Sequence, residues 1–229
     1  MVVKPDPQAQ PIAILFSAGL DSAVLAADAA RHVAVQPIYI SVGLAWERQE
    51  LALASRLLQS PPYARVRPLV TLTFDMRDIY PATHWAIRGE APAFDTPDED
   101  VYLEGRNIAL LGKASVYMAR AGLSRIFIGP LAGNPFPDAS PEFFRAMERA
   151  LSIGLASPIT IEAPFADLDK ADVIRRGAAL HVPFDLTMSC MQPEEGLHCG
   201  RCSKCRERRD GFIDAKVEDP TRYAVAPLR

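Results

Sequence analysis

Three features common in other protein classes are missing from this chain of 229 residues: cysteine before position 190, an apolar run near the ~20 residues of a membrane span, and a basic excess. The 25 Lys and Arg residues are outnumbered by 28 Asp and Glu residues, which argues against a dedicated nucleic-acid or membrane binder. Residues 1–10 are polar and lack the apolar core of a signal peptide. We therefore expect a cytoplasmic protein with reduced thiols that acts on small molecules.

All four cysteines lie in one run near the C-terminus: Cys190, Cys199, Cys202 and Cys205. Four thiolates this close in sequence can close a tetrahedral site around one Zn²⁺, which leaves no position for water. Reduced thiols favour such a metal site over disulfides, so we predict a structural zinc site, with His198 as a neighbour only. The surrounding basic residues are interpreted as a solvated helix face; they are Arg201, Lys204, Arg206, Arg208 and Arg209.

Short apolar runs alternate with amphipathic stretches along the rest of the chain. Strands are predicted at 12–16, 35–41, 67–72, 125–129 and 159–161, and helices at 22–31, 46–58, 106–120, 141–153 and 170–180. This alternation predicts an α/β fold, with a mostly parallel sheet covered by helices on both faces. Residues 11–186 would form that domain, and 187–216 a small zinc-binding appendage packed on it. The proline-bearing segment 80–100 is interpreted as a loop over the ligand crevice or a disordered lid.

The segment Ser17-Ala-Gly19-Leu-Asp21-Ser22 joins the first predicted strand to the first predicted helix. Small residues there let the backbone approach an anion, and the unpaired N–H groups that begin a helix favour negative charge. Ser17 and Ser22 add hydroxyl donors, whereas Asp21 would repel phosphate and is expected to cap the helix or to bind Mg²⁺. The segment is not the G-x4-G-K-[ST] loop of mononucleotide-binding proteins. The alternative is a simple turn in which serine and aspartate cap a helix.

This loop resembles the pyrophosphate loop of the N-type ATP pyrophosphatases, which have an adenine nucleotide alpha hydrolase-like fold and split ATP into AMP and pyrophosphate. The usual loop is Ser-Gly-Gly-x-Asp-Ser. Ala18 replaces its first glycine here, which is tolerable if this residue has a negative φ. The resemblance implies that ATP lies along Leu15, Phe16, Ser17, Ala18, Gly19, Leu20, Asp21, Ser22, Ala23, Val24, Leu25 and Gly129.

Further motifs occur in the order found in the 7-cyano-7-deazaguanine synthases of queuosine biosynthesis, and the resemblance covers residues 12 to about 223. They are Tyr102-Leu-Glu-Gly-Arg106-Asn107, Gly129, Phe136-Pro-Asp138 with Pro141-Glu-Phe-Phe144, Lys170-Ala171, and Ser189-Cys190 with the cysteine run. The resemblance implies that ATP and Mg²⁺ activate 7-carboxy-7-deazaguanine and that ammonia then forms the amide. A second ATP activates the amide oxygen, whose loss leaves the nitrile. The family also suggests a homodimer.

Catalytic roles follow from this resemblance. Ser17, Asp21 and Ser22 are expected to hold the pyrophosphate, directly or through Mg²⁺. Arg106 opens a predicted helix, where a guanidinium can fork onto phosphate oxygens, and Lys170 corresponds to a lysine that meets the β- and γ-phosphates. The alternative for Arg106 and Lys170 is a solvated charge at the start of a surface helix.

The acceptor is expected to contact Trp46, Asn107 and Asp138. A carboxylate at Asp138 suits the N1–H and 2-amino donors of a guanine-like base. Trp46 could stack on a flat base or belong equally well to the core.

Three departures from the family pattern lie where the acceptor, rather than ATP, would bind. They are Val42-Gly-Leu-Ala-Trp-Glu-Arg48 for an Asp-Tyr-Gly-Gln-like segment, Ala139-Ser140 for Cys-Arg, and Glu104 for a proline. They keep open a second hypothesis, an ATP pyrophosphatase of the same fold that adenylates another deazapurine, a thiolation target or a macromolecule. A third, a non-enzymatic nucleotide-binding or zinc-ribbon module, is disfavoured because the loop, the arginine and the lysine are all retained.

Overall fold

The sheet is parallel throughout, as the sequence predicts. The computed structural model describes residues 10–226, so most of the polar segment 1–10 lies outside the described residues. The strands are β1 (Ile12–Leu15), β2 (Val35–Ser41), β3 (Val70–Thr73), β4 (Arg125–Phe127) and β5 (Thr160–Glu162), in the order β3-β2-β1-β4-β5. β3 begins later than the predicted 67 because its pairing with β2 sets Val70 opposite Ile38.

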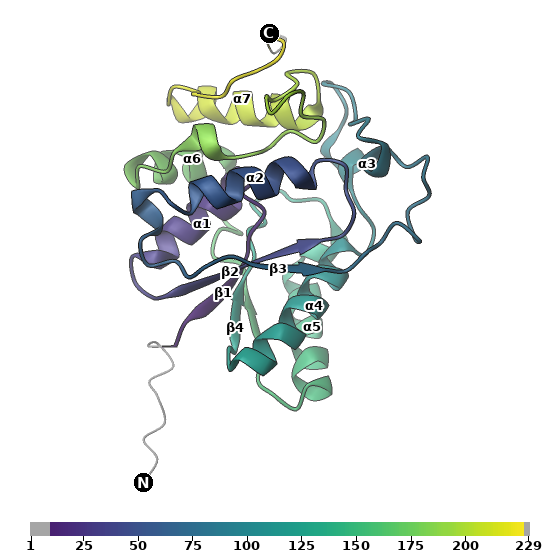
Figure 1. The fold of residues 1–229 in the computed structure, drawn as a ribbon, viewed down its shortest axis with the longest axis vertical. Coiled ribbons are helices and arrows are strands. Elements are labelled where there is room, and N and C mark those ends of the chain that lie inside the picture. Colours follow the sequence, from purple (N-terminus) through teal and green to yellow (C-terminus); the bar gives the residue numbers. More distant parts are fainter. Residues whose placement is uncertain (1–9, 227–229) are drawn as a thin grey trace.

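Helices cover both faces of this sheet (Figure 1). One face carries α1 (Leu20–Ala30), α2 (Glu47–Leu57), α6 (Lys170–Ala179) and α7 (Ser203–Ala215), and the other carries α4 (Arg106–Ala121) and α5 (Pro141–Gly154). Successive side chains of a strand point to opposite faces, so Ile12 and Ile14 pack in the core under α1 and α6, while Ala13 packs in the core under α4. Short 3-10 turns lie at Pro61–Tyr63, Asp98–Val101, Pro137–Ala139 and Phe184–Leu186.

The order of the strands places a crevice beside β1. From β1 the chain crosses through α1 to β2 on one side, whereas β4 and β5 lie on the other. In open α/β sheets, ligands bind beyond the carboxyl ends of the strands where the order reverses. The loops that follow β1 and β4 therefore flank the expected binding crevice.

The segment 80–100 is ordered and packed, so its interpretation as a disordered lid is wrong. It contains α3 (Trp85–Arg88), and the Trp85 ring stacks on Trp46 with 5.8 Å between centroids. The carbonyl oxygens of Phe94 and Thr96 accept hydrogen bonds from Arg206 at 2.7 and 3.1 Å. Proline and acidic residues made this segment look irregular in sequence, but its partners include Trp46 and Arg206, which lie far away along the chain.

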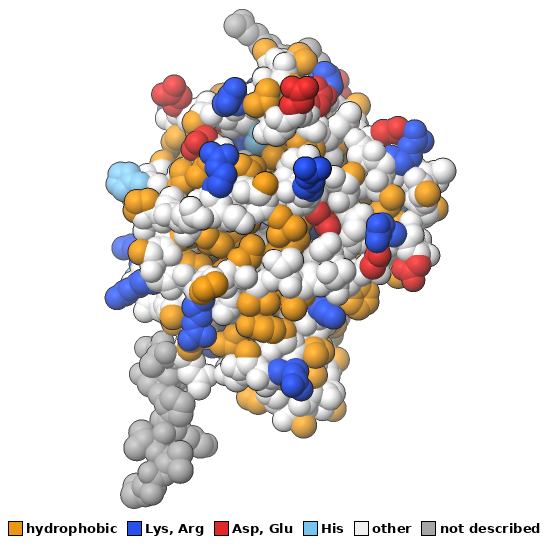
Figure 2. Space-filling model, in the orientation of Figure 1, with side chains coloured by type: hydrophobic (Ala, Val, Ile, Leu, Met, Phe, Trp, Pro, Cys, Tyr) orange, Lys and Arg blue, Asp and Glu red, His pale blue; other side chains and the backbone are white. Residues whose placement is uncertain are grey.

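Charges of both signs are scattered over the face drawn in Figure 2, and neither sign gathers into a patch. Within residues 10–226, no helix has the length and apolar character needed to cross a membrane.

Candidate functional site

The loop after β1 is held by its serines. The Ser22 hydroxyl donates to Gly19 O at 3.1 Å, and it accepts from the Ser17 amide at 3.3 Å. The N-cap of α1 is Gly19, which has no side-chain cap, so the expectation that Asp21 caps the helix is wrong. Asp21 instead lies in the first turn of α1 and binds Lys170.

Ala18 has a φ of +57°, in the left-handed region, so the condition of a negative φ is not met. Its carbonyl accepts a hydrogen bond from Met188 N at 2.8 Å, and its side chain is buried. An alanine in this conformation costs about 1 kcal/mol relative to glycine. The loop therefore keeps the backbone shape that a glycine adopts freely.

A cavity of about 280 Å³ lies beyond β1 and β4, and we call it the β1–β4 cavity. The predicted nucleotide residues on its wall are Leu15, Phe16, Ser17, Gly19, Asp21, Ser22 and Gly129. Arg106 and Asn107, at the start of α4, complete one side of it. Ala23, Val24 and Leu25 belong to the hydrophobic core, so any contact with a nucleotide would be indirect.

A second cavity of about 230 Å³, the α6–α7 cavity, adjoins the first. Its wall includes Leu20, Trp46 and Lys170, together with residues of the C-terminal segment 187–216. Five residues line both cavities: Ser17, Gly19, Asp21, Glu50 and Arg106. These five mark the junction where a phosphate chain and an acceptor could meet.

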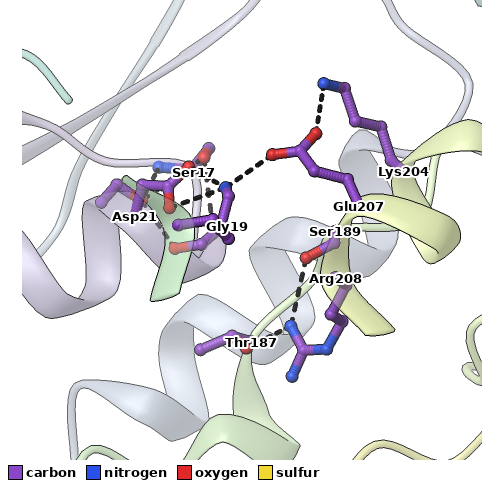
Figure 3. A network of polar contacts seen from close by, with 10 residues as sticks. Ser17, Gly19, Asp21, Thr187, Ser189, Lys204, Glu207 and Arg208 are labelled. Atoms are coloured by element: carbon purple, nitrogen blue, oxygen red, sulfur yellow. Dashed lines mark hydrogen bonds and ion pairs between the residues drawn. The ribbon is translucent and has the colours of Figure 1, made fainter. Parts of the chain in front are cut away.

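Ion pairs connect the loop to α7 (Figure 3). Lys170 Nζ lies 2.7 Å from Asp21 Oδ2 and 2.8 Å from Glu207 Oε1, and Glu207 also binds Lys204. Burial would lower the pKa of Lys170, but Asp21 and Glu207 raise it above its usual value. Burial would raise the pKa of Glu207, but Lys170 and Lys204 lower it to about 2. Lys170 and Glu207 are therefore both charged at neutral pH.

Arg208 is only 2% exposed, so its interpretation as part of a solvated face is wrong. Its guanidinium donates to Thr187 Oγ1 at 2.8 Å and to Ser189 Oγ at 3.1 Å (Figure 3). It also donates to Phe184 O at 2.8 Å. It thus fixes α7 to the segment before Cys190.

Arg106 faces both cavities, and its Nε is buried without a partner among the described residues. A buried donor left unpaired is costly, which indicates that a ligand acceptor belongs there.

Asp138 lies behind the β1–β4 cavity rather than on the wall of either cavity. Its carboxylate accepts from Asn107 N at 3.1 Å, and its carbonyl accepts from Asn107 Nδ2 at 2.9 Å. Burial raises the pKa of Asp138 above its usual value. Asp138 therefore fixes the position of Asn107, which does line the cavity.

Trp46 is buried in the core, where its ring stacks on Trp85, although it also reaches the wall of the α6–α7 cavity. A flat base that stacked on Trp46, the first of the two predicted alternatives, would therefore have to share the Trp46 ring with Trp85.

The four cysteines converge on one buried site. Their Sγ atoms all lie within 4.8 Å of one another, with separations of 3.5, 3.9 and 4.0 Å for three of the pairs. Four sulfurs at about 2.3 Å from a tetrahedral Zn²⁺ would be roughly 3.8 Å apart. A disulfide needs about 2.05 Å, so these are free thiols with the spacing of a metal site.

His198 is not in this set of sulfurs. Its Nε2 accepts from Ser189 N at 3.1 Å, and burial lowers its pKa to about 3, so the ring is neutral. It supports the chain beside the cysteines.

Sequence reasoning missed Glu50, Tyr39 and Glu207. Glu47, Glu50, Ala54 and Leu57 form the buried side of α2, and two acids on a buried helix face are a detectable signal. Glu207 gave no signal, because its meeting with Lys170 depends on how α7 docks.

The chain is similar in sequence to known proteins over most of its length. The family model for queuosine biosynthesis protein QueC matches residues 12–216. A 7-cyano-7-deazaguanine synthase of Azoarcus sp. (strain BH72) is 35% identical over 92% of this chain and 95% of its own length. One of Anaeromyxobacter dehalogenans (strain 2CP-C) is 33% identical over 97% of this chain and 100% of its own. A solved U34-tRNA thiolase of Methanococcus maripaludis superposes with a TM-score of 0.49 and 10% identity over 91% of this chain and 73% of that one.

Proposed function

Because the chain belongs to the QueC family of queuosine biosynthesis proteins, we propose that it is an ATP-dependent 7-cyano-7-deazaguanine synthase. It converts 7-carboxy-7-deazaguanine and ammonia to the nitrile through adenylated intermediates and releases AMP and pyrophosphate. The observation that carries this proposal is the convergence of Ser17, Asp21, Arg106 and Lys170 on one crevice, in a chain that matches the family over 12–216.

The proposed reaction requires little covalent chemistry from the protein itself. A carboxylate oxygen is a poor leaving group, and adenylation lets it depart as part of AMP. Ser17, Ser22 and the amides that begin α1 bind the pyrophosphate, while Arg106 and Lys170 balance the charge that develops on it. Asp21 is the residue suited to hold Mg²⁺, which neutralises phosphate charge when bound.

The cysteine site supports a structural role for the metal, and we propose that the ion is Zn²⁺. Four thiolates fill a tetrahedral shell, so no open position remains for substrate. We therefore place the reaction in the crevice and not at the cysteine site.

A second candidate acceptor is favoured by the turn that contains Trp46. The aromatic stack with Trp85 fills space beside the α6–α7 cavity, and Ala139, which departs from the Cys-Arg that the family resemblance leads us to expect, lines the β1–β4 cavity. Another deazapurine, a thiolation target or a macromolecular carboxylate or carbonyl could therefore receive AMP in the same crevice.

One assay separates these candidates. Purified protein is incubated with ATP, Mg²⁺, ammonium and 7-carboxy-7-deazaguanine. The nucleotides are then resolved by chromatography, and the deazapurine product is identified by mass spectrometry. We expect AMP, pyrophosphate and the nitrile. AMP released only with another acceptor would support the second candidate, and binding of ATP without any turnover would support a non-enzymatic module.

Asp138→Asn should raise the acceptor KM or abolish turnover while ATP binding is kept. Asparagine keeps one acceptor oxygen for Asn107 N, but it removes the negative charge and puts an NH2 group in place of the second oxygen, so the hydrogen bond weakens. The weaker contact holds Asn107 less firmly on the cavity wall. Steady-state kinetics in both substrates tests the prediction, with Asp185→Asn, in the turn Phe184–Leu186, as a matched control away from both cavities. Unchanged acceptor kinetics in Asp138→Asn would contradict it.

A further inference from the structure

Glu50 is a buried carboxylate at the junction of the two cavities. It is 7% exposed, it projects from α2, and it lines both the β1–β4 cavity and the α6–α7 cavity. Of the five residues common to both walls, Ser17, Gly19 and Asp21 belong to the loop and Arg106 begins α4. Glu50 therefore faces the place where the phosphate chain and the acceptor would meet.

Glu50 differs from the other carboxylates on these walls in its partners. Asp21 and Glu207 are both paired with Lys170. Glu50 accepts a hydrogen bond from Tyr39 Oη at 2.7 Å and forms no ion pair within the described residues. A carboxylate without a cation bound to it keeps its affinity for a proton.

The groups that face Glu50 come from three elements. Burial raises its pKa to about 7, a rise that Arg106 of α4 and Tyr39 of β2 oppose. Glu47 of α2 raises the pKa, and Trp46 lowers it. A base whose pKa lies near the working pH combines a large deprotonated fraction with a useful proton affinity.

The proposed reaction requires such a base. When ammonia attacks the acyl adenylate, a C–N bond forms, the C–O bond to AMP breaks with its electron pair, and one N–H proton must leave. When the amide oxygen has been adenylated, loss of AMP to give the nitrile requires that the nitrogen lose two more protons. We propose that Glu50 is a catalytic residue that accepts these N–H protons, one at a time, and passes each to solvent through the cavities. This inference rests on the proposed synthase function.

Glu50→Gln tests the inference, because glutamine keeps the size and can still accept from Tyr39. The zinc-loaded variant is assayed first for exchange of labelled pyrophosphate into ATP that depends on added 7-carboxy-7-deazaguanine. It is then assayed for conversion of the synthetic amide to the nitrile. We expect exchange within about threefold of wild type, since no N–H proton moves in that step. Nitrile formation should fall by about 10²- to 10⁴-fold, the usual contribution of a positioned base.

The pH profile supplies a readout that a structural role would not move. With the amide as substrate, the assay contains no ammonia whose titration could affect the profile. The wild-type kcat should decrease as the pH is lowered below about 7. Tyr39→Phe removes a hydrogen bond that favours the charged form, so this limb should move to higher pH. The matched acid on α2, Glu47→Gln, should move it to lower pH, because Glu47 raises the pKa of Glu50.

Folding of Glu50→Gln is checked by thermal melting and metal content. The raised pKa means that wild-type stability declines as pH rises from about 4.5 to about 7, so the neutral variant should melt no lower than wild type at pH 8. Wild-type rates of nitrile formation in Glu50→Gln, or an acid limb that persists in it, overturn the role of Glu50 alone. Absence of both exchange and nitrile with the wild-type protein overturns the proposed function and this inference together.

Discussion

Asp21→Ala is expected to reduce turnover by at least about 10³-fold, because a residue that places Mg²⁺ on the pyrophosphate contributes several kcal/mol to the transition state. The fold should survive. Lys170 retains Glu207 at 2.8 Å, so the substitution does not leave a buried ammonium without a partner. AMP release at saturating ATP and acceptor measures the effect.

The control for Asp21→Ala is Asp28→Asn. Asp28 lies on the same helix but pairs with Arg31 and Arg176 outside both cavities, so near-normal turnover is expected. Release of ADP and phosphate as the only products, by either protein, would refute cleavage between the α- and β-phosphates.

Cys202→Ser should lose the metal and most of the soluble folded protein. Structural zinc sites contribute on the order of 10 kcal/mol to small metal-dependent folds, which exceeds the net stability of a typical domain. Cys202 is the N-cap of α7, and its Sγ lies 3.5 Å from that of Cys205, so a serine there removes one of the four sulfur ligands at the start of the helix. Metal per chain and the soluble fraction are the measurements.

Ser203→Ala is the matched control for Cys202→Ser. Ser203 is equally buried, and its hydroxyl has no partner among the described residues, so its removal should leave metal content unchanged. A Cys202→Ser protein that keeps one tightly bound metal, or a disulfide among the remaining cysteines, would contradict a closed four-thiolate site.

The sequence predicted the five strands and the long helices, but it predicted neither α3 nor the contacts between elements. Buried strands such as β2 are apolar on both faces, and their ends are marked by turns, so β2 matches its predicted bounds. The sequence did not reveal the backbone conformation at Ala18, whose positive φ accompanies a hydrogen bond from Met188 N, 170 positions away. Arg208 was misjudged for the same reason, since four partners from other segments bury it.

The residues of the candidate site likewise fall into two groups, those that a local motif identifies and those that only tertiary contacts place. Its loop, Arg106 and Lys170 carry local motifs and were predicted to act together, and they do lie on adjoining cavities. Glu50 and Glu207 carry no motif of their own. Their position depends on the docking of α2 and α7, which is a tertiary property.

The contact between α6 and α7 has a consequence for how the two ends of the molecule influence each other. Gly211 leaves no room for a side chain, since a Cβ there would lie 2.5 Å from Lys170 Cγ, and Glu207 of the same helix holds the Lys170 ammonium. The helix that begins at the cysteine cluster thus helps to set the position of a lysine that faces the loop after β1. Binding at two sites that share one element is thermodynamically reciprocal. If the metal strengthens the hold on ATP, then ATP strengthens the hold on the metal by the same factor.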